Sequence, residues 1–96
     1  LDAAGLAELR LVEAGARRDL GEVDAALLVL SDAGVHNPHV YPWTVRLWYA
    51  YGDALGAAGR DDEAMEWFDR VSAEDDDGET DAELRAAALR GGAMPG

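Results

Sequence analysis

A stretch in the second half of the chain constrains the fold more strongly than any other. Trp48, Tyr51 and Leu55 fall on one face of a helix because they are spaced i, i+3 and i+7. Gly52 adds no side chain to that side, so a second helix can approach it closely. Gly59 predicts the end of this helix, because glycine readily adopts the left-handed conformation of a C-terminal stop. The stretch therefore predicts a helical hairpin, and its apolar face implies neighbouring hairpins that cover it.

The pattern of small residues around this hairpin occurs twice. In the first half of the chain the pattern is Ala14, Gly21, Ala26 and Leu30, and in the second half it is Gly52, Gly59, Ala64 and Phe68. In both sets successive members are 7, 5 and 4 residues apart. The matched residues Ala26 and Ala64 are 38 positions apart. These spacings predict an internal repeat of two hairpins, joined by a loop over residues 35–42 that holds two of the three prolines.

Apolar periodicity and glycine positions predict five helices. We expect them over residues 6–19, 22–33, 43–58, 61–73 and 80–90. The residues expected to face the core are Leu9, Val12, Ala16 and Leu20 with Leu11 and Ala14 beside them in the first helix, Val23, Ala26, Leu27 and Leu30 in the second, and Ala82, Ala86 and Leu89 in the last. Asp61 is a candidate N-cap, and Thr80 with Glu83 forms the pattern of a capping box.

The second hairpin resembles the signature of the tetratricopeptide repeat (TPR) family, W-x-x-L-G-x-x-Y followed by A-x-x-x-F, through Trp48-x-x-Tyr51-Gly52-x-x-Leu55 and Ala64-x-x-x-Phe68. The resemblance implies an all-α stack of antiparallel helical hairpins with about two and a half repeats. Its expected parts are a TPR-like domain over residues 1–90, with repeat one at about 7–38, repeat two at about 45–76 and a capping helix at about 80–90, and a flexible tail over 91–96. Repeat one departs from the signature, since Arg10, Glu13 and Arg17 stand where it has large apolar residues.

Longer segments are similar to the C-terminal part of an actinobacterial family of TPR proteins. These segments are residues 9–21, residues 46–51 with 59–60, and residues 77–82. The resemblance extends over about residues 8–88. Because members of that family are longer, all-helical, cytoplasmic proteins of unknown biochemical role, it implies an array that extends toward the N-terminus and supplies no function.

Charge and composition narrow the classes of partner. The net charge is −12, and every basic residue is an arginine. An acidic surface repels phosphate groups, so we expect neither nucleic acid nor an anionic membrane as a partner. The chain has no cysteine and no apolar run near the roughly 18 residues that span a bilayer. These features favour a cytoplasmic protein.

Two groups of polar residues are candidate metal sites. His36 and His39 offer two ligands, whereas a zinc site needs three or four in fixed geometry. Asp75 and Asp77 resemble part of a calcium loop that lacks two of its ligands, so weak ion binding over residues 75–81 is only an alternative. The two serines lie late in helices without a nearby histidine. We therefore expect no metal site, no cofactor and no enzyme activity.

The TPR resemblance implies a binding surface. In TPR arrays the first helix of each repeat lines a concave face that receives peptides. The helical phase of the motif places there Glu8, Leu11, Val12, Gly15 and Arg18 from repeat one, and Arg46, Tyr49, Ala50, Asp53 and Gly56 from repeat two. The predicted peptide-binding residues are Leu11, Gly15, Arg18, Arg46, Tyr49 and Asp53.

Tyr49 carries much of this hypothesis. Trp48 and Tyr51 already supply the core, so Tyr49 points elsewhere and its polar tip suits an interface. Arg18 and Arg46 can pair with carboxylates of a partner. The sequence therefore favours a non-catalytic protein–protein interaction module that binds a peptide or partner protein. The alternative is a structural or self-association segment in which Tyr49 packs against a neighbouring repeat; an uncovered N-terminal hairpin also predicts a homodimer.

Overall fold

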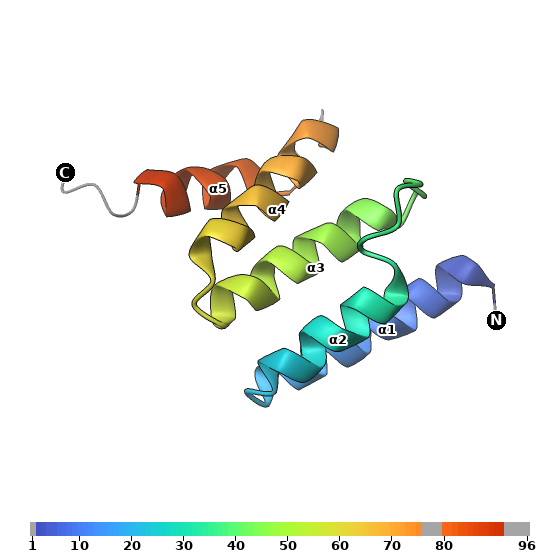
Figure 1. The fold of residues 1–96 in the computed structure, drawn as a ribbon. Coiled ribbons are helices and arrows are strands. Elements are labelled where there is room, and N and C mark those ends of the chain that lie inside the picture. The colour runs from blue at the N-terminus through green and yellow to red at the C-terminus, as the bar shows by residue number, and fades with distance from the viewer. Residues whose placement is uncertain (1, 76–79, 92–96) are drawn as a thin grey trace.

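The computed structural model describes residues 2–75 and 80–91, and within them the chain forms five α-helices and no strand (Figure 1). The helices are α1 (Ala3–Asp19), α2 (Val23–Ala33), α3 (Thr44–Ala57), α4 (Asp61–Glu74) and α5 (Ala82–Gly91). The all-α stack of hairpins predicted from the sequence is confirmed. None of the described helices is long and apolar enough to cross a membrane. The middle of the expected acidic turn and most of the expected tail lie outside the described residues.

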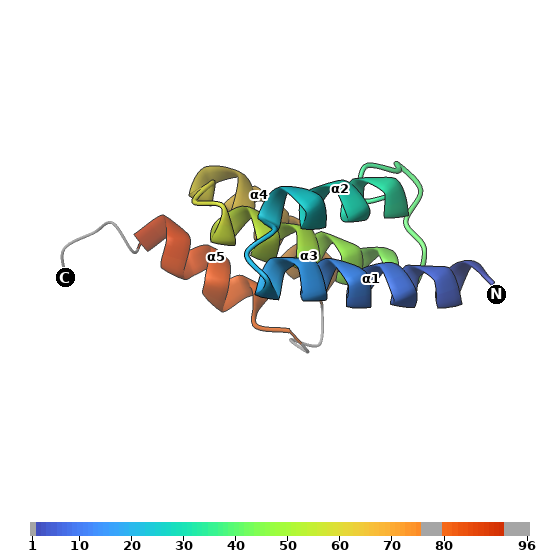
Figure 2. The same cartoon turned by 90° about the horizontal axis from the view of Figure 1, so that it is seen from below.

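The helices pack as consecutive antiparallel pairs. α1 lies against α2, α3 against α4, and α5 against α4. α3 also contacts both helices of the first hairpin, and Figure 2 shows α1 and α2 side by side in front of it. One side of the first hairpin is therefore covered by α3, while its other side faces away from the stack.

Glycine ends the first helix of each hairpin in the same way. Gly21 and Gly59 have φ of 81° and 79°, the left-handed region that glycine adopts without strain. In both turns the next residue donates its backbone N–H to a carbonyl five residues back, Glu22 to Arg17 and Arg60 to Leu55. This is the bond that closes a Schellman cap. The predicted stops at the two glycines are confirmed.

The matched positions of the two hairpins have matched burial. Ala26 and Ala64 are fully buried, as are Leu30 and Phe68 four residues later. Gly52 lies so close to α4 that a Cβ built on it would be 3.1 Å from Cε1 of Phe68. The small residue therefore sets how near α3 and α4 approach, as the sequence predicted.

The loop between the hairpins is anchored to α3. Val35 is buried, and its carbonyl accepts a hydrogen bond of 3.2 Å from Nε1 of Trp48. The buried hydroxyl of Thr44 accepts one of 2.8 Å from the backbone N–H of Tyr41. These bonds satisfy buried polar groups where the ladder of helical hydrogen bonds is interrupted.

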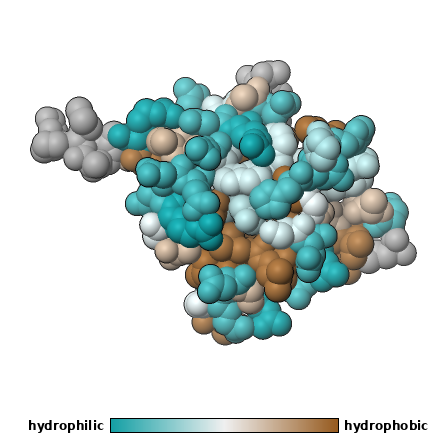
Figure 3. Space-filling view, in the orientation of Figure 1, coloured by the Kyte–Doolittle hydropathy of each residue, from teal (hydrophilic) through white to brown (hydrophobic). Residues whose placement is uncertain are grey.

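The prediction for the core face of α1 was right for Ala14, which is buried, and Leu11, which packs against the core, but wrong for the larger stripe beside them. Leu9, Val12 and Leu20 are 54%, 68% and 73% exposed, whereas Ala7 and Ala14 are buried. α1 carries two apolar stripes, and the packed one is the stripe of small residues because alanine allows α2 and α3 to approach closely. The sequence pattern favours the larger residues as the core face, because large apolar residues give the stronger periodic signal. Apolar surface also gathers along α2 and toward the α1–α2 turn in Figure 3, where Leu28 is exposed.

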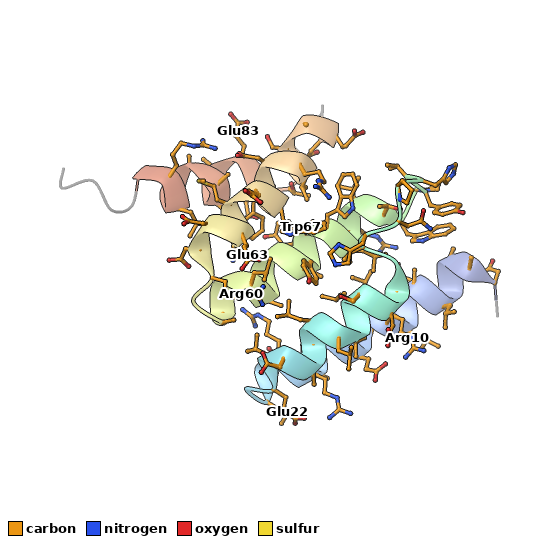
Figure 4. The ribbon with its side chains drawn as sticks, viewed as in Figure 1. Arg10, Glu22, Arg60, Glu63, Trp67 and Glu83 are labelled. Atoms are coloured by element: carbon orange, nitrogen blue, oxygen red, sulfur yellow. The ribbon has the colours of Figure 1, made fainter. Side chains whose placement is uncertain are left out.

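Two capping predictions were also wrong. Arg60 occupies the N-cap of α4, and Asp61 is the first helical residue. The negative charge of Asp61 interacts favourably with the positive N-terminal end of the helix dipole. Arg60 instead pairs with Glu63 in the first turn of α4 (Figure 4). α5 begins at Ala82, and the hydroxyl of Thr80 accepts from the backbone N–H of that residue at 3.3 Å. Thr80 therefore lies before the helix and forms no capping box.

Candidate functional site

Five side chains from α1, α3 and the start of α5 are joined on one face of the stack, and we call them the polar bridge: Arg18, Asp53, Arg85, Tyr49 and Asp81. The carboxylate of Asp53 lies between two guanidinium groups, with Oδ2 at 2.5 Å from Nε of Arg18 and Oδ1 at 3.0 Å from Nη1 of Arg85. Nη1 of Arg85 also donates to the hydroxyl of Tyr49 at 3.1 Å, and this hydroxyl donates to Asp81. Side chains thus link the first, third and fifth helices.

The contact between Arg18 and Asp53 is an ion pair more than a hydrogen bond. The Nε–H of Arg18 is buried but is not directed at an acceptor, and Nη2 lies 3.4 Å from Oδ1 of Asp53. The Asp53 side chain is only 21% exposed, so its charge is screened less by water than those of surface pairs. Loss of this carboxylate would leave two partly buried arginines without their shared partner.

Two hollows adjoin the polar bridge. The larger, of about 500 Å³, is lined by Leu11, Val45, Arg46, Tyr49, Ala50, Thr80 and Asp81. The smaller, of about 50 Å³, is lined by Leu11, Ala14, Gly15, Arg18, Ala26, Leu30, Ala50, Asp53 and Ala54. Leu11 and Ala50 line both, so the hollows are neighbours on the face formed by α1 and α3. The lining of both hollows is mainly apolar, with a few polar side chains among it.

All six residues predicted to bind a peptide line one of these hollows. Leu11, Arg46 and Tyr49 line the larger one. The smaller one is lined by Leu11, Gly15, Arg18 and Asp53. The structure therefore brings the predicted residues together on one surface. Of the other residues expected on this face, Glu8 forms an ion pair with Arg46, and Ala50 lies between the two hollows.

The polar residues of this face already have partners within the chain. For Tyr49 the sequence left open a contact with a partner or packing within the stack, and in the structure its hydroxyl bonds to Asp81 and Arg85. Its ring also meets Phe68 edge-on, with centroids 5.4 Å apart. Arg18 and Arg46, expected to await a partner's carboxylates, pair instead with Asp53 and Glu8. Folding brings these complementary groups within reach of one another, which their positions in the sequence did not reveal.

The environment of Tyr49 changes its acidity. Burial and then the hydrogen bond to Asp81 raise the pKa of Tyr49 above its ordinary value, and the neighbouring Arg85 opposes this rise. The hydroxyl therefore stays protonated at neutral pH and can donate to Asp81. It acts here as a positioning group between α3 and α5.

Two residues expected on the concave face lie elsewhere. Val12 is exposed and lines neither hollow, because it is one residue and therefore about 100° around α1 from Leu11. A Cβ built on Gly56 would lie 3.9 Å from Cβ of Ala64, so Gly56 faces α4. It shares this side with Gly52, one turn earlier on α3.

A third hollow and an aromatic cluster lie away from the polar bridge. The hollow, of about 280 Å³, is lined by Ala3, Leu6, Ala7, Arg10, Asp32, Ala33, Gly34, Asn37, Tyr41, Trp43, Thr44 and Leu47. In the cluster, the ring of His36 meets the edges of Tyr51 and Trp67 at 5.4 and 5.6 Å. His39 lies instead against Tyr41, with ring centroids 4.3 Å apart. The two histidines thus pack against different rings.

The described part of the chain contains no group of three or more His, Cys, Asp or Glu side chains that could hold a metal ion. The hypothesis of ion binding over residues 75–81 falls mostly on residues outside those described.

Asp81 and Arg85 are the residues of this face that sequence reasoning missed. They lie four residues apart at the start of α5, beside the buried residues Ala82 and Ala86. This spacing places them on one helical side and was the one available signal. Their partners, Tyr49 for Asp81 and both Tyr49 and Asp53 for Arg85, are distant in the sequence, and contacts across such a distance have no sequence pattern.

No protein-family model, curated protein or solved structure matches this chain.

Proposed function

We propose that this protein is a non-catalytic protein-interaction module of the TPR type, which binds a segment of a partner protein on the face of α1 and α3. The observation that carries the proposal is the pair of adjoining hollows with a mainly apolar lining beside the polar bridge. A concave site of mainly apolar lining with a few polar groups at its rim is the usual form of a binding pocket. The repeated hairpin geometry supports the TPR assignment.

An apolar side chain of the partner would enter the larger hollow. Leu11, Val45 and Ala50 supply apolar contacts, and Tyr49 forms a wall with a polar edge. The ion pair between Arg46 and Glu8 lies at the rim with both side chains more than half exposed. Such exposed pairs stabilise a fold by about 0–1 kcal/mol, so this pair can exchange partners at little cost.

The charge of the molecule favours a basic partner. Acidic residues number 20 and basic residues 8. Every arginine already contacts a carboxylate or, in the case of Arg70, the rings of Trp48 and Trp67. The unneutralised charge is therefore negative, and it attracts a positively charged segment over several ångströms. We expect a segment that combines lysine or arginine with one large apolar residue.

The test fills both hollows with a larger apolar side chain and leaves the ion pairs and hydrogen bonds of the polar bridge intact. Ala50→Leu places a larger side chain at the position shared by both hollows. Ala57→Leu is the matched control, because Ala57 is exposed near the end of the same helix and lines neither hollow. A displayed library of random linear peptides is selected on the immobilised protein, and the enriched peptides are tested on both variants.

We expect the enriched peptides to be basic with an apolar anchor, to lose binding to Ala50→Leu and to retain it on Ala57→Leu. Their affinity should also fall as salt is added, because charge attraction is screened. Peptides that bind both variants equally would place the site elsewhere. A library without any enriched sequence would argue against a peptide-binding face.

The second candidate function is a structural segment with no open groove. It is favoured by one observation, namely that Tyr49, Arg18 and Arg46 are all paired within the chain. Under this function Ala50→Leu raises the thermal midpoint by filling space and changes no binding. The peptide selection distinguishes the two functions, and circular dichroism melting of Ala50→Leu and Ala57→Leu checks that both variants fold.

A further inference from the structure

The outward side of α1 carries a continuous apolar stripe, which we call the outer stripe: Leu9, Val12, Ala16 and Leu20. Its members are spaced by 3, 4 and 4 residues and are all exposed. Since consecutive residues turn by about 100°, this side of the helix lies opposite buried Ala14. The spacing is that of a helix seam, with an apolar residue on every turn over most of α1. Single exposed leucines are ordinary, but a stripe of this length is typical of an interaction surface.

The charges beside the stripe are balanced. α1 holds three acidic residues and three arginines, whereas α4 holds six acidic residues and one arginine. α4 packs on the other side of α3 from the first hairpin (Figure 1). Two copies can therefore bring their α1 helices together while their acidic helices remain apart. Because the net charge is −12, two copies repel one another overall, and a surface with balanced charge keeps this repulsion low at the contact.

The flank of the stripe is self-complementary. Glu13 and Arg17 lie one turn apart on the same side of α1, next to Val12 and Ala16. In an antiparallel pair of α1 helices related by a two-fold axis, equal flanks meet. Glu13 of each copy then faces Arg17 of the other, so the symmetric pair contains two such contacts. Their present partners, Arg10 for Glu13 and Glu22 for Arg17, form exposed pairs that are readily extended into a network.

We infer that the outer stripe docks a second copy of this chain, through antiparallel packing of α1 against α1. Leu11 and Arg18, which line the hollows, lie on another side of α1 and stay open in such a dimer. The dimer thus presents two binding faces in one assembly. A partner with two binding segments is then held more tightly than either segment alone, because the second contact is intramolecular.

The test measures the mass of the full chain by light scattering at high micromolar concentration. Leu9→Glu and Leu20→Glu place a charge in the stripe. Leu84→Glu is the matched control, because Leu84 is 74% exposed on α5 and the same charge is added there. We expect dimers for the unaltered chain and for Leu84→Glu. Each stripe variant should raise the dimer dissociation constant on the order of a hundredfold.

A second pair of variants tests the two-fold arrangement. Glu13→Arg alone should weaken the dimer several-fold, and Glu13→Arg combined with Arg17→Glu should restore it. Circular dichroism should be unchanged in every variant, since all of these residues are exposed or half-buried. A monomer at every concentration would overturn the inference. Dissociation by Leu84→Glu to the same degree as by Leu9→Glu would overturn it too, as would failure of the double variant to restore the dimer.

Discussion

Replacement of Gly52 by alanine tests what sets the separation of α3 and α4. In the interior of an exposed helix this change usually stabilises a protein by about 0.5–1 kcal/mol, because alanine loses less conformational entropy than glycine. At Gly52 the new methyl group would lie 3.1, 3.2 and 3.3 Å from three ring carbons of Phe68. Contacts this short require the ring to move.

Phe68 has little room to move. It is buried, its ring meets that of Tyr49 edge-on, and the guanidinium of Arg85 lies 4.4 Å from its centroid. Overpacking of a close-packed site costs about 1–3 kcal/mol. This cost outweighs the gain in helix propensity, so Gly52→Ala should lower the free energy of unfolding by up to about 2 kcal/mol. For a domain of this size, a loss of about 2 kcal/mol lowers the Tm by about 8–16 °C.

Two other glycines in helices provide matched controls. A Cβ on Gly15 would meet nothing within 4 Å, and one on Gly56 would make an ordinary contact of 3.9 Å with Ala64. Urea unfolding followed by circular dichroism should therefore show higher midpoints for Gly15→Ala and Gly56→Ala, and a lower midpoint for Gly52→Ala. In a chain that carries Phe68→Leu, Gly52→Ala should destabilise less than it does in the unaltered chain, because the ring that the new methyl group meets is gone. If all three alanine variants gained stability equally, close packing at Gly52 would not set the helix separation.

Two predictions concern the polar bridge. Tyr49→Phe keeps the ring but removes the hydroxyl, so it should lower the free energy of unfolding by about 1 kcal/mol, measured by urea unfolding at neutral pH. The folded-state pKa of Tyr49 is raised, so its protonated hydroxyl stabilises the fold fully below about pH 10, and this stabilisation is lost as pH rises further. Urea unfolding at alkaline pH should therefore show a fall in stability in the unaltered chain that is absent from Tyr49→Phe. Asp53→Asn should lower the free energy of unfolding by about 1 kcal/mol, and by less in high salt. The control Asp69→Asn breaks the exposed pair with Arg90 and should lower it by less than about 0.5 kcal/mol in the same assay.

The helices were predictable because their ends are marked locally. Gly21 and Gly59 stop helices through their own backbone preference, and this preference acts before any tertiary contact forms. The buried alanines at 26 and 64 and their partners Leu30 and Phe68 followed from spacing alone. Signals of this kind depend on neighbours within a few residues, which a sequence displays directly.

The orientation of α1 was not predictable from local signals. Its two apolar stripes differ in size, and the choice between them depends on which helices are available to pack against. The small stripe with Ala7 and Ala14 wins because α2 and α3 approach there. The same reasoning explains why the sequence left the contacts of Tyr49 open. Its partners Asp81 and Arg85 are brought near by the packing of α5 against α4, which no short motif encodes.

The position of α5 links the stability of the fold to its proposed function. α5 packs Ala82 and Ala86 against α4 and reaches α3 through the polar bridge. Polar links hold a helix in register but fill little space, and the larger hollow remains between α3 and residues 80 and 81. A partner side chain that enters there adds apolar contacts where the fold has few. Under the proposed function, binding would therefore strengthen the packing of α5 without displacing a core residue, and the packing of α5 would in turn favour binding.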